Sequence, residues 1–325
     1  MRRIPALTVL MALALLATPV FAQSSAPTAG FRAVLLSDFN GPYGSTTYPA
    51  ALERSMQRIL NEWKPDLLIS AGDVVAGQKT TLPGQAFAEM WNAFDRAVAA
   101  PLRQAGIPYA FAVGNHDASS ARGRDGRYTF AREREAASRY WQAHVPDLAF
   151  TDRDRFPFAY AFTFRGVFFA FVDASGPQVQ DLEWLERTLA SRAAREASMR
   201  IVVGHLSLYG VSQGRSKPGE VLAQPERFRA LLERQGVHTY ISGHHAAFYP
   251  GRRGALNLLA SGGIGGRDYV GHPGTARSSV TVMDFGAGGY RLTSYDAVTG
   301  QEIPLSSLPP FLEGYGGRVE RMDLR

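Results

Sequence analysis

Five short apolar segments of this chain end in the same way, at a small residue followed by an acid, an amide or a histidine. The five ends are Asp38-Phe39-Asn40, Gly72-Asp73, Gly114-Asn115-His116-Asp117, Gly204-His205 and Gly243-His244-His245. Apolar runs of this length predict buried strands, and Gly and Asn are typical of the turns that end them. Ligands of α/β sheets bind at the carboxyl ends of strands, so the pattern predicts a polar site at one sheet edge.

Helical spacing separates the first three of these strands. Apolar residues recur with a helical period over residues 49–63 and 85–100, which predicts a parallel sheet with helical crossovers. Further along the chain, residues 159–164 and 167–172 predict an antiparallel hairpin, and residues 178–192 and 225–234 predict helices. The fold class expected from these elements is α/β.

The composition limits the chemistry that such a site can hold. Hydrophobic residues make up 45% of the chain and charged residues 20%, as in ordinary globular proteins, and there is no cysteine. The lack of cysteine excludes disulfides, thiolate metal sites and cysteine nucleophiles. A metal ion would have to be held by His, Asp, Glu, Asn or backbone oxygens.

In their order and strand context, the five ends resemble the signature of the calcineurin-like metallophosphoesterases, D-x-H, G-D, G-N-H-D/E, H and G-H-x-H. The resemblance covers roughly residues 31–295. It implies a four-layer αββα sandwich with two mixed β-sheets. It also implies hydrolysis of a phosphate mono- or diester by a metal-bound hydroxide, with a small phosphorylated molecule as the substrate.

The resemblance also assigns metal ligands. Asp73 matches the bridging carboxylate, and Asn115, His205 and His244 match the remaining ligands of one divalent ion, with Mn, Fe, Zn or Ni as candidates. Asp38 and Asn40 match ligands of the other ion. Asn40 stands where the family usually has His, and Ala246 stands where the family has the last His. We therefore expect one firmly bound ion and a second that is weak or missing, unless the turn brings the neighbouring His245 into place.

Catalytic roles follow from the same match. His116 corresponds to a histidine that assists the leaving group without binding metal, and Asp117 is expected to orient its imidazole through a hydrogen bond. Two alternatives remain open. His205 and His244 could be buried, hydrogen-bonded histidines, and the chain could be a binding module with an eroded metal site and little catalysis.

A basic stretch follows the central motif, with six arginines and three acids in residues 118–139. Most of it is expected to be solvated, but Arg122, Arg124 and Arg127 are predicted to contact the substrate anion. The formal net charge of +6 becomes +4 without the two arginines of residues 1–22. Such mild basicity suits an anionic substrate and does not indicate nucleic acid.

The first 22 residues have the pattern of a signal peptide. Arg2 and Arg3 precede an apolar segment over residues 6–17, and Val20-Phe21-Ala22 fits the cleavage pattern. We expect a periplasmic or secreted protein with a phosphoesterase domain over residues 23–304 and a C-terminal tail over residues 305–325. No later stretch is apolar enough to span a membrane. The sequence indicates no oligomeric state.

Overall fold

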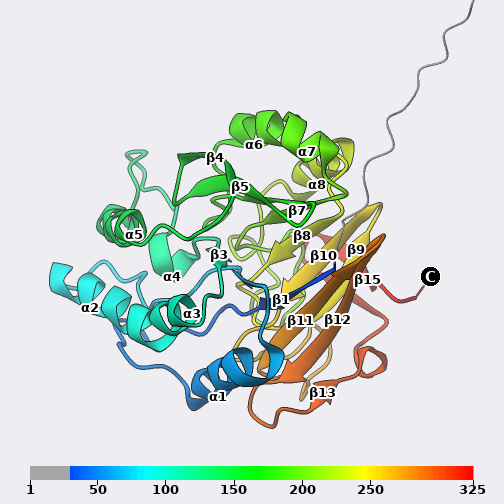
Figure 1. Ribbon diagram of the computed structural model, residues 1–325, viewed down its shortest axis with the longest axis horizontal. Helices are drawn as coiled ribbons and strands as arrows, with labels where there is room; N and C mark the ends of the chain where they lie inside the picture. Colours follow the sequence, from blue (N-terminus) through cyan, green and yellow to red (C-terminus); the bar gives the residue numbers. More distant parts are fainter. Residues whose placement is uncertain (1–29, 325) are drawn as a thin grey trace, which may run out of the picture.

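Two mixed β-sheets with helices outside them form the core of the computed structural model, which describes residues 30–324 (Figure 1). The predicted signal peptide lies outside the described residues. The mixed α/β sandwich with two mixed sheets confirms the predicted fold class.

The smaller sheet contains the first three predicted strands. Its order is β13-β12-β11-β1-β2-β3, in which β1, β2 and β3 are parallel and the other pairs are antiparallel. The bounds are β1 (Phe31–Leu35), β2 (Leu67–Ser70), β3 (Tyr109–Phe111), β11 (Ser279–Gly286), β12 (Gly289–Asp296) and β13 (Glu302–Ile303). The carboxyl ends of the three parallel strands therefore meet at one edge, as expected.

The larger sheet has the order β14-β15-β9-β10-β8-β7-β6-β5-β4, and its parallel strands are β6, β7, β8 and β10. The predicted hairpin is β5 and β6. The bounds are β4 (Phe150–Arg155), β5 (Ala159–Phe164), β6 (Val167–Phe171), β7 (Met199–Val203), β8 (Thr239–Ser242), β9 (Phe248–Arg253), β10 (Leu256–Ser261), β14 (Phe311–Gly314) and β15 (Gly317–Arg321). Residues of the predicted tail thus pair with this sheet through β15 and β9.

The helices lie outside the two sheets (Figure 1). They are α1 (Ala50–Arg58) with its continuation η1 (Ile59–Trp63), α2 (Gly84–Phe94), η2 (Asp95–Ala99), α3 (Ala100–Gln104), α4 (Asn115–Ala118), α5 (Ala131–Ala143), α6 (Leu182–Leu189), α7 (Arg192–Glu196), α8 (Pro225–Arg234) and η3 (Leu305–Ser307). The single helix expected over residues 178–192 is wrong. Asp181 adopts a left-handed φ of 53°, so α6 begins only after it, and the Ser191 hydroxyl caps a separate helix, α7.

The interior between the sheets is aromatic and fully buried. Tyr160 of β5 reaches across to β3, where its hydroxyl bonds to both the N–H and the carbonyl of Phe111. Phe169 of β6 packs edge-on against Phe285 of β11, with ring centroids 6.3 Å apart. These contacts fix one sheet against the other and so fix the relative position of their strand ends. Within the described residues, no helix is long and apolar enough to cross a membrane.

Candidate metal centre and active site

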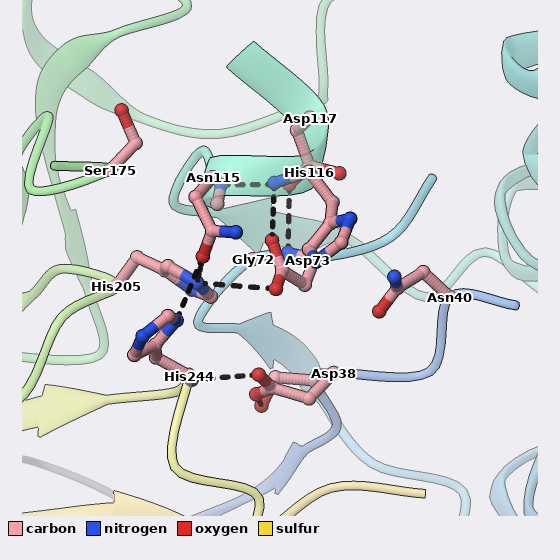
Figure 2. Close-up of polar contacts among 12 residues, drawn as sticks. Asp38, Asn40, Gly72, Asp73, Asn115, His116, Asp117, Ser175, His205 and His244 are labelled. Carbon is pink, nitrogen blue, oxygen red and sulfur yellow. Dashed lines mark hydrogen bonds and ion pairs between the residues drawn. The ribbon is translucent and has the colours of Figure 1, made fainter. Parts of the chain in front are cut away.

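The predicted strand ends of both sheets meet at one place (Figure 2). Asp73 follows β2 and Asn115 begins α4 directly after β3, so the smaller sheet supplies a carboxylate and an amide. His205 follows β7 and His244 follows β8, so the larger sheet supplies two imidazoles. All four side chains are buried. The structure therefore brings together the four residues that were predicted to hold one ion.

The donor atoms of these side chains converge. Asn115 Oδ1 lies 2.8 Å from His205 Nε2 and 2.8 Å from His244 Nδ1. Asp73 Oδ2 lies 3.3 Å from His205 Nε2. One ligand atom from each of Asp73, His205 and His244 lies within 4.8 Å of the other two. A carboxylate, an amide oxygen and two imidazoles in this arrangement fit a divalent transition metal ion.

Each histidine of the cluster is oriented by a hydrogen bond on its far side. His205 Nδ1 donates to the carbonyl of Ala71 at 2.7 Å, which leaves Nε2 facing the cluster. His244 Nε2 lies 2.8 Å from the carboxylate of Glu220 and 2.8 Å from Arg215 Nη1, so this nitrogen is engaged on the far side and Nδ1 faces the cluster. Metal-binding histidines commonly have such partners, which fix the tautomer and the ring orientation. Buried core histidines can have such partners too, but here the second nitrogen of each ring also converges on Asn115 and Asp73, which favours the metal site.

Asn115 is oriented in the same way. Its Nδ2 donates to Gln78 Oε1 at 2.6 Å, so Oδ1 points at the imidazoles. The backbone around the cluster is left-handed at five residues other than glycine, with φ of 51° at Asp38, 58° at Asp73, 65° at Gln78, 64° at His244 and 44° at Ala246. Such conformations cost about 1–3 kcal/mol each and gather at functional sites. Here they turn the side chains toward one another.

Two glycines of the motifs are required by close approach. A Cβ atom on Gly114 would overlap the carboxylate of Asp73, and one on Gly243 would lie 2.6 Å from Asp38 Oδ2. Real Cβ atoms do not approach that closely, so a larger residue at either position would displace an acid of the site. The glycine in each strand-end motif is thus part of the site's geometry.

The charges of the cluster compensate one another. Burial alone would lower the pKa of His205, but the Asp73 carboxylate offsets it and raises that pKa to about 9. Burial alone would raise the pKa of Asp73, but His205 and His116 hold it below its ordinary value. Burial lowers the pKa of His244 to about 4, so its imidazole is neutral near pH 7. A divalent ion would take the place of the proton on His205, because imidazole binds metal only when neutral.

Asp38 lies beside the cluster, but both oxygens of its carboxylate accept hydrogen bonds from neighbouring residues. Its Oδ1 accepts the backbone N–H of His244 at 2.7 Å and its Oδ2 accepts the Ser37 hydroxyl at 2.6 Å. Burial raises the pKa of Asp38 to about 7. Figure 2 shows Asn40 set apart from the cluster, and its amide makes only a 3.4 Å contact with Gly41.

The other candidate ligands for the ion that Asp38 and Asn40 were expected to hold do not complete its site either. Ala246 has no donor atom, and His245 points elsewhere. His245 Nδ1 accepts the backbone N–H groups of Val211 and Ser212, each at 3.2 Å, and its Nε2 lies 3.1 Å from the carbonyl of Glu220. The turn therefore does not bring His245 into the vacant ligand position, and Asp38 and Asp73 do not make a complete second site.

His116 lines the cavity above the cluster. Its Nδ1 lies 3.1 Å from the carbonyl of Gly77, so that nitrogen donates and Nε2 remains for a ligand. The ring stacks on Tyr43 with centroids 5.2 Å apart, and the backbone N–H donates to Asp73 at 2.8 Å. The predicted hydrogen bond from Asp117 to this imidazole is wrong, because the Gly77 carbonyl orients the ring.

Asp117 instead organises the turns that carry the ligands. Four backbone N–H groups donate to its carboxylate at 2.7–2.9 Å, those of Gly114, Asp73, Val74 and Val75. A carboxylate that accepts several backbone N–H groups can fix two chain segments against each other. Asp117 therefore ties the turn after β2 to the turn after β3.

Comparison with known families agrees with this geometry. The model of the calcineurin-like phosphoesterase family matches residues 31–248, about two thirds of the chain. This chain belongs to the calcineurin-like phosphoesterases. That membership places it among metal-dependent hydrolases. A search of curated proteins found no match.

Solved structures share the phosphoesterase fold at low identity. A purple acid phosphatase from yellow lupin (Lupinus luteus) has a TM-score of 0.58 and 15% identity, covering 85% of this chain and 53% of the lupin chain. GAP50, the anchor in the inner membrane complex of Plasmodium, has a TM-score of 0.52 and 16% identity, covering 85% and 87%. A dimetal phosphatase from Danio rerio has a TM-score of 0.50 and 15% identity, covering 82% and 99%. This chain spans about half the length of the lupin enzyme.

The phosphoesterase site opens into a cavity of about 470 Å³. Its lining includes five residues that the sequence analysis did not single out: Tyr43, Gln78, Arg215, Glu220 and Arg267. Two of them could be found from the sequence, because Arg215 and Glu220 lie in the loop that follows the strand end at His205. The sequence analysis selects Arg122, Arg124 and Arg127 on the same ground, since they follow the strand end at Asn115.

The arginines predicted for substrate binding lie outside this cavity lining. Arg122 donates to the carbonyl of Gly126 at 2.8 Å, and its guanidinium lies 4.0 Å from the centre of the Tyr128 ring. Arg124 and Arg127 are exposed. Their contact with the substrate of this phosphoesterase stays a prediction.

Proposed function

We propose that this protein hydrolyses a phosphate ester with a single firmly bound divalent metal ion. The observation that carries the proposal is the convergence of Asp73, Asn115, His205 and His244, in which each neutral donor is oriented by a partner outside the cluster. Four such side chains from four strand ends have no structural need to share one point. Mn, Fe, Zn and Ni all suit the donor set.

The residues of the cavity have different roles in the proposed reaction. Asp73, Asn115, His205 and His244 would hold the ion, which when bound would polarise a phosphoryl oxygen and lower the pKa of water toward neutrality. His116, as an imidazolium whose Nδ1–H donates to the Gly77 carbonyl, gives its Nε2 proton to the leaving oxygen and becomes neutral; no residue among 30–324 bonds to that nitrogen. Glu220 and Gln78 hold two of the ligands in their orientation.

The cavity and the N-terminal sequence support a setting for the proposed reaction. We propose a small phosphorylated substrate, since the cavity is about 470 Å³ and carries arginine and histidine on its wall. The basic, apolar and small-residue pattern of residues 1–22 supports an exported, bacterial-type member of the family that acts in the periplasm or outside the cell.

Metal removal tests the proposal. Protein treated with a chelator and dialysed should hydrolyse neither p-nitrophenyl phosphate nor bis(p-nitrophenyl) phosphate, and about one equivalent of Mn²⁺ should restore hydrolysis. Asn115→Ala should lower both the metal bound per chain and the rate. Asn92→Ala is the control, since that residue is exposed on α2. Metal-loaded protein that binds phosphate but cleaves no ester would support the binding-module alternative instead.

A further inference from the structure

Three charged residues other than histidine line the cavity, and only one of them lacks a partner. Glu220 Oε2 accepts from Arg215 Nη1 at 2.6 Å and from His244 Nε2 at 2.8 Å. Asp268, next to Arg267 in the chain, accepts a backbone N–H of its own loop at 2.7 Å. Among residues 30–324, no carboxylate pairs with Arg267 and no hydrogen bond engages it. The cavity therefore contains one uncompensated guanidinium.

The loop that carries Arg267 is fixed in place. Tyr269 forms a backbone bridge with Ser212, and so ties this loop to the one that follows His205. Gly266 has a φ of 62°, and a Cβ atom there would lie 2.7 Å from the carbonyl carbon of Arg277. Only glycine fits that turn, which presents Arg267 to the cavity.

This loop also borders the incomplete ion position. The backbone N–H of Ile264 donates to the carbonyl of Asp38 at 3.1 Å. Partial burial and the neighbouring Arg215 lower the pKa of Arg267, while Glu220 and Asp38 act in the opposite direction. The loop that carries Arg267 therefore contacts Asp38, the acid whose ion lacks the ligands expected at Asn40 and Ala246.

Two-metal phosphoesterases use two ions to offset the charge of the phosphoryl group. Here the residues fit one ion only, so a second positive charge must come from the chain. We propose that Arg267 binds a terminal phosphoryl oxygen of the substrate and takes the part of the missing ion. A guanidinium can bond two oxygens of one phosphate side by side.

A monoester offers three such oxygens and about two negative charges, whereas a diester offers two oxygens and one charge. The cavity thus selects phosphate monoesters.

The inference rests on the proposed function, but phosphate binding tests it without turnover. Protein loaded with one equivalent of Mn²⁺ is titrated with inorganic phosphate at low salt, with wild type, Arg267→Gln and Arg267→Lys compared. Arg267→Gln should raise the Kd for phosphate about 10- to 100-fold, as loss of a charge-assisted bond does, with the metal content unchanged. Arg267→Lys should recover part of the affinity. The KM for p-nitrophenyl phosphate should rise more than that for bis(p-nitrophenyl) phosphate.

Arg192→Gln is the matched control, because that arginine is 85% exposed and pairs with Glu196 in its own helix. It should bind phosphate as the wild type does. Equal phosphate affinity in Arg267→Gln and Arg192→Gln would overturn the inference, and so would a wild type that binds phosphate only with two ions per chain. A wild type that hydrolyses neither ester would overturn the proposed function, while the phosphate titration would still decide the role of Arg267.

Discussion

His116 shows how single contacts set a residue's role. The Gly77 carbonyl holds Nδ1, the Tyr43 ring covers one face, and the backbone N–H donates to Asp73. The imidazole is thus fixed close to the metal ligands without belonging to them. We propose that its remaining nitrogen serves proton transfer, and loss of the side chain should leave the ligand set intact.

His116→Ala should lower kcat about 10²- to 10⁴-fold, the usual value of general acid–base assistance. The metal bound per chain should remain that of the wild type, because no donor atom of the cluster comes from this side chain. Steady-state kinetics and metal analysis after dialysis measure the two quantities. Loss of metal together with activity would show that His116 is a ligand.

At the scale of elements, the C-terminal hairpin is the clearest addition to the predicted organisation. Strands β14 and β15 extend the larger sheet by pairing Glu320 and Arg321 with Arg252 and Gly251 of β9. Leu312 of β14 is 1% exposed. The hairpin buries apolar side chains and completes the edge of a sheet whose other strands carry His205 and His244.

Leu312→Ala should reduce the free energy of unfolding by about 2–5 kcal/mol, the usual cost of removing a buried leucine side chain. Leu324→Ala, in the same segment but 53% exposed, should change it little. Urea unfolding of the metal-free proteins measures the difference. Equal stabilities of the two variants would mean that the hairpin does not pack as described.

At the scale of the whole molecule, the candidate metal centre joins the two sheets. Asp73 and Asn115 follow strands of the smaller sheet, whereas His205 and His244 follow strands of the larger one. An ion held by all four residues would link the two layers at the edge where the cavity opens. Folded protein alone presents this set of donors, so metal binding and folding are coupled.

Metal should therefore stabilise the protein. At a free Mn²⁺ concentration about 100 times its Kd, the gain is about 2.7 kcal/mol, and the Tm should rise by several degrees. Asn115→Ala should show a much smaller rise, whereas Asn92→Ala should behave as the wild type. Thermal unfolding with and without added Mn²⁺ measures this. A Tm that does not respond to metal in the wild type would contradict the four-residue site.

The sequence alone determined the strands that carry the motifs and the chemistry at their ends. Apolar runs followed by Gly-Asp, Gly-Asn-His-Asp and Gly-His specify local structure, because the period of the pattern and the turn residues act over only a few positions. The same local rules predicted α8 at its observed bounds, residues 225–234. The resemblance of these strand ends to the phosphoesterase signature predicted which four residues would share a metal site.

Only the tertiary structure decided which way each side chain points and which loops face the cavity. His244 joins the cluster and His245 turns away because the backbone is left-handed at residue 244, with φ of 64°. Asp117 binds backbone N–H groups rather than His116, because two turns that are 40 residues apart in the chain pack together there. Arg267 reaches the cavity through a backbone bridge between two distant loops. No pattern along the chain encodes these contacts, because each depends on segments that meet only after the two sheets have packed.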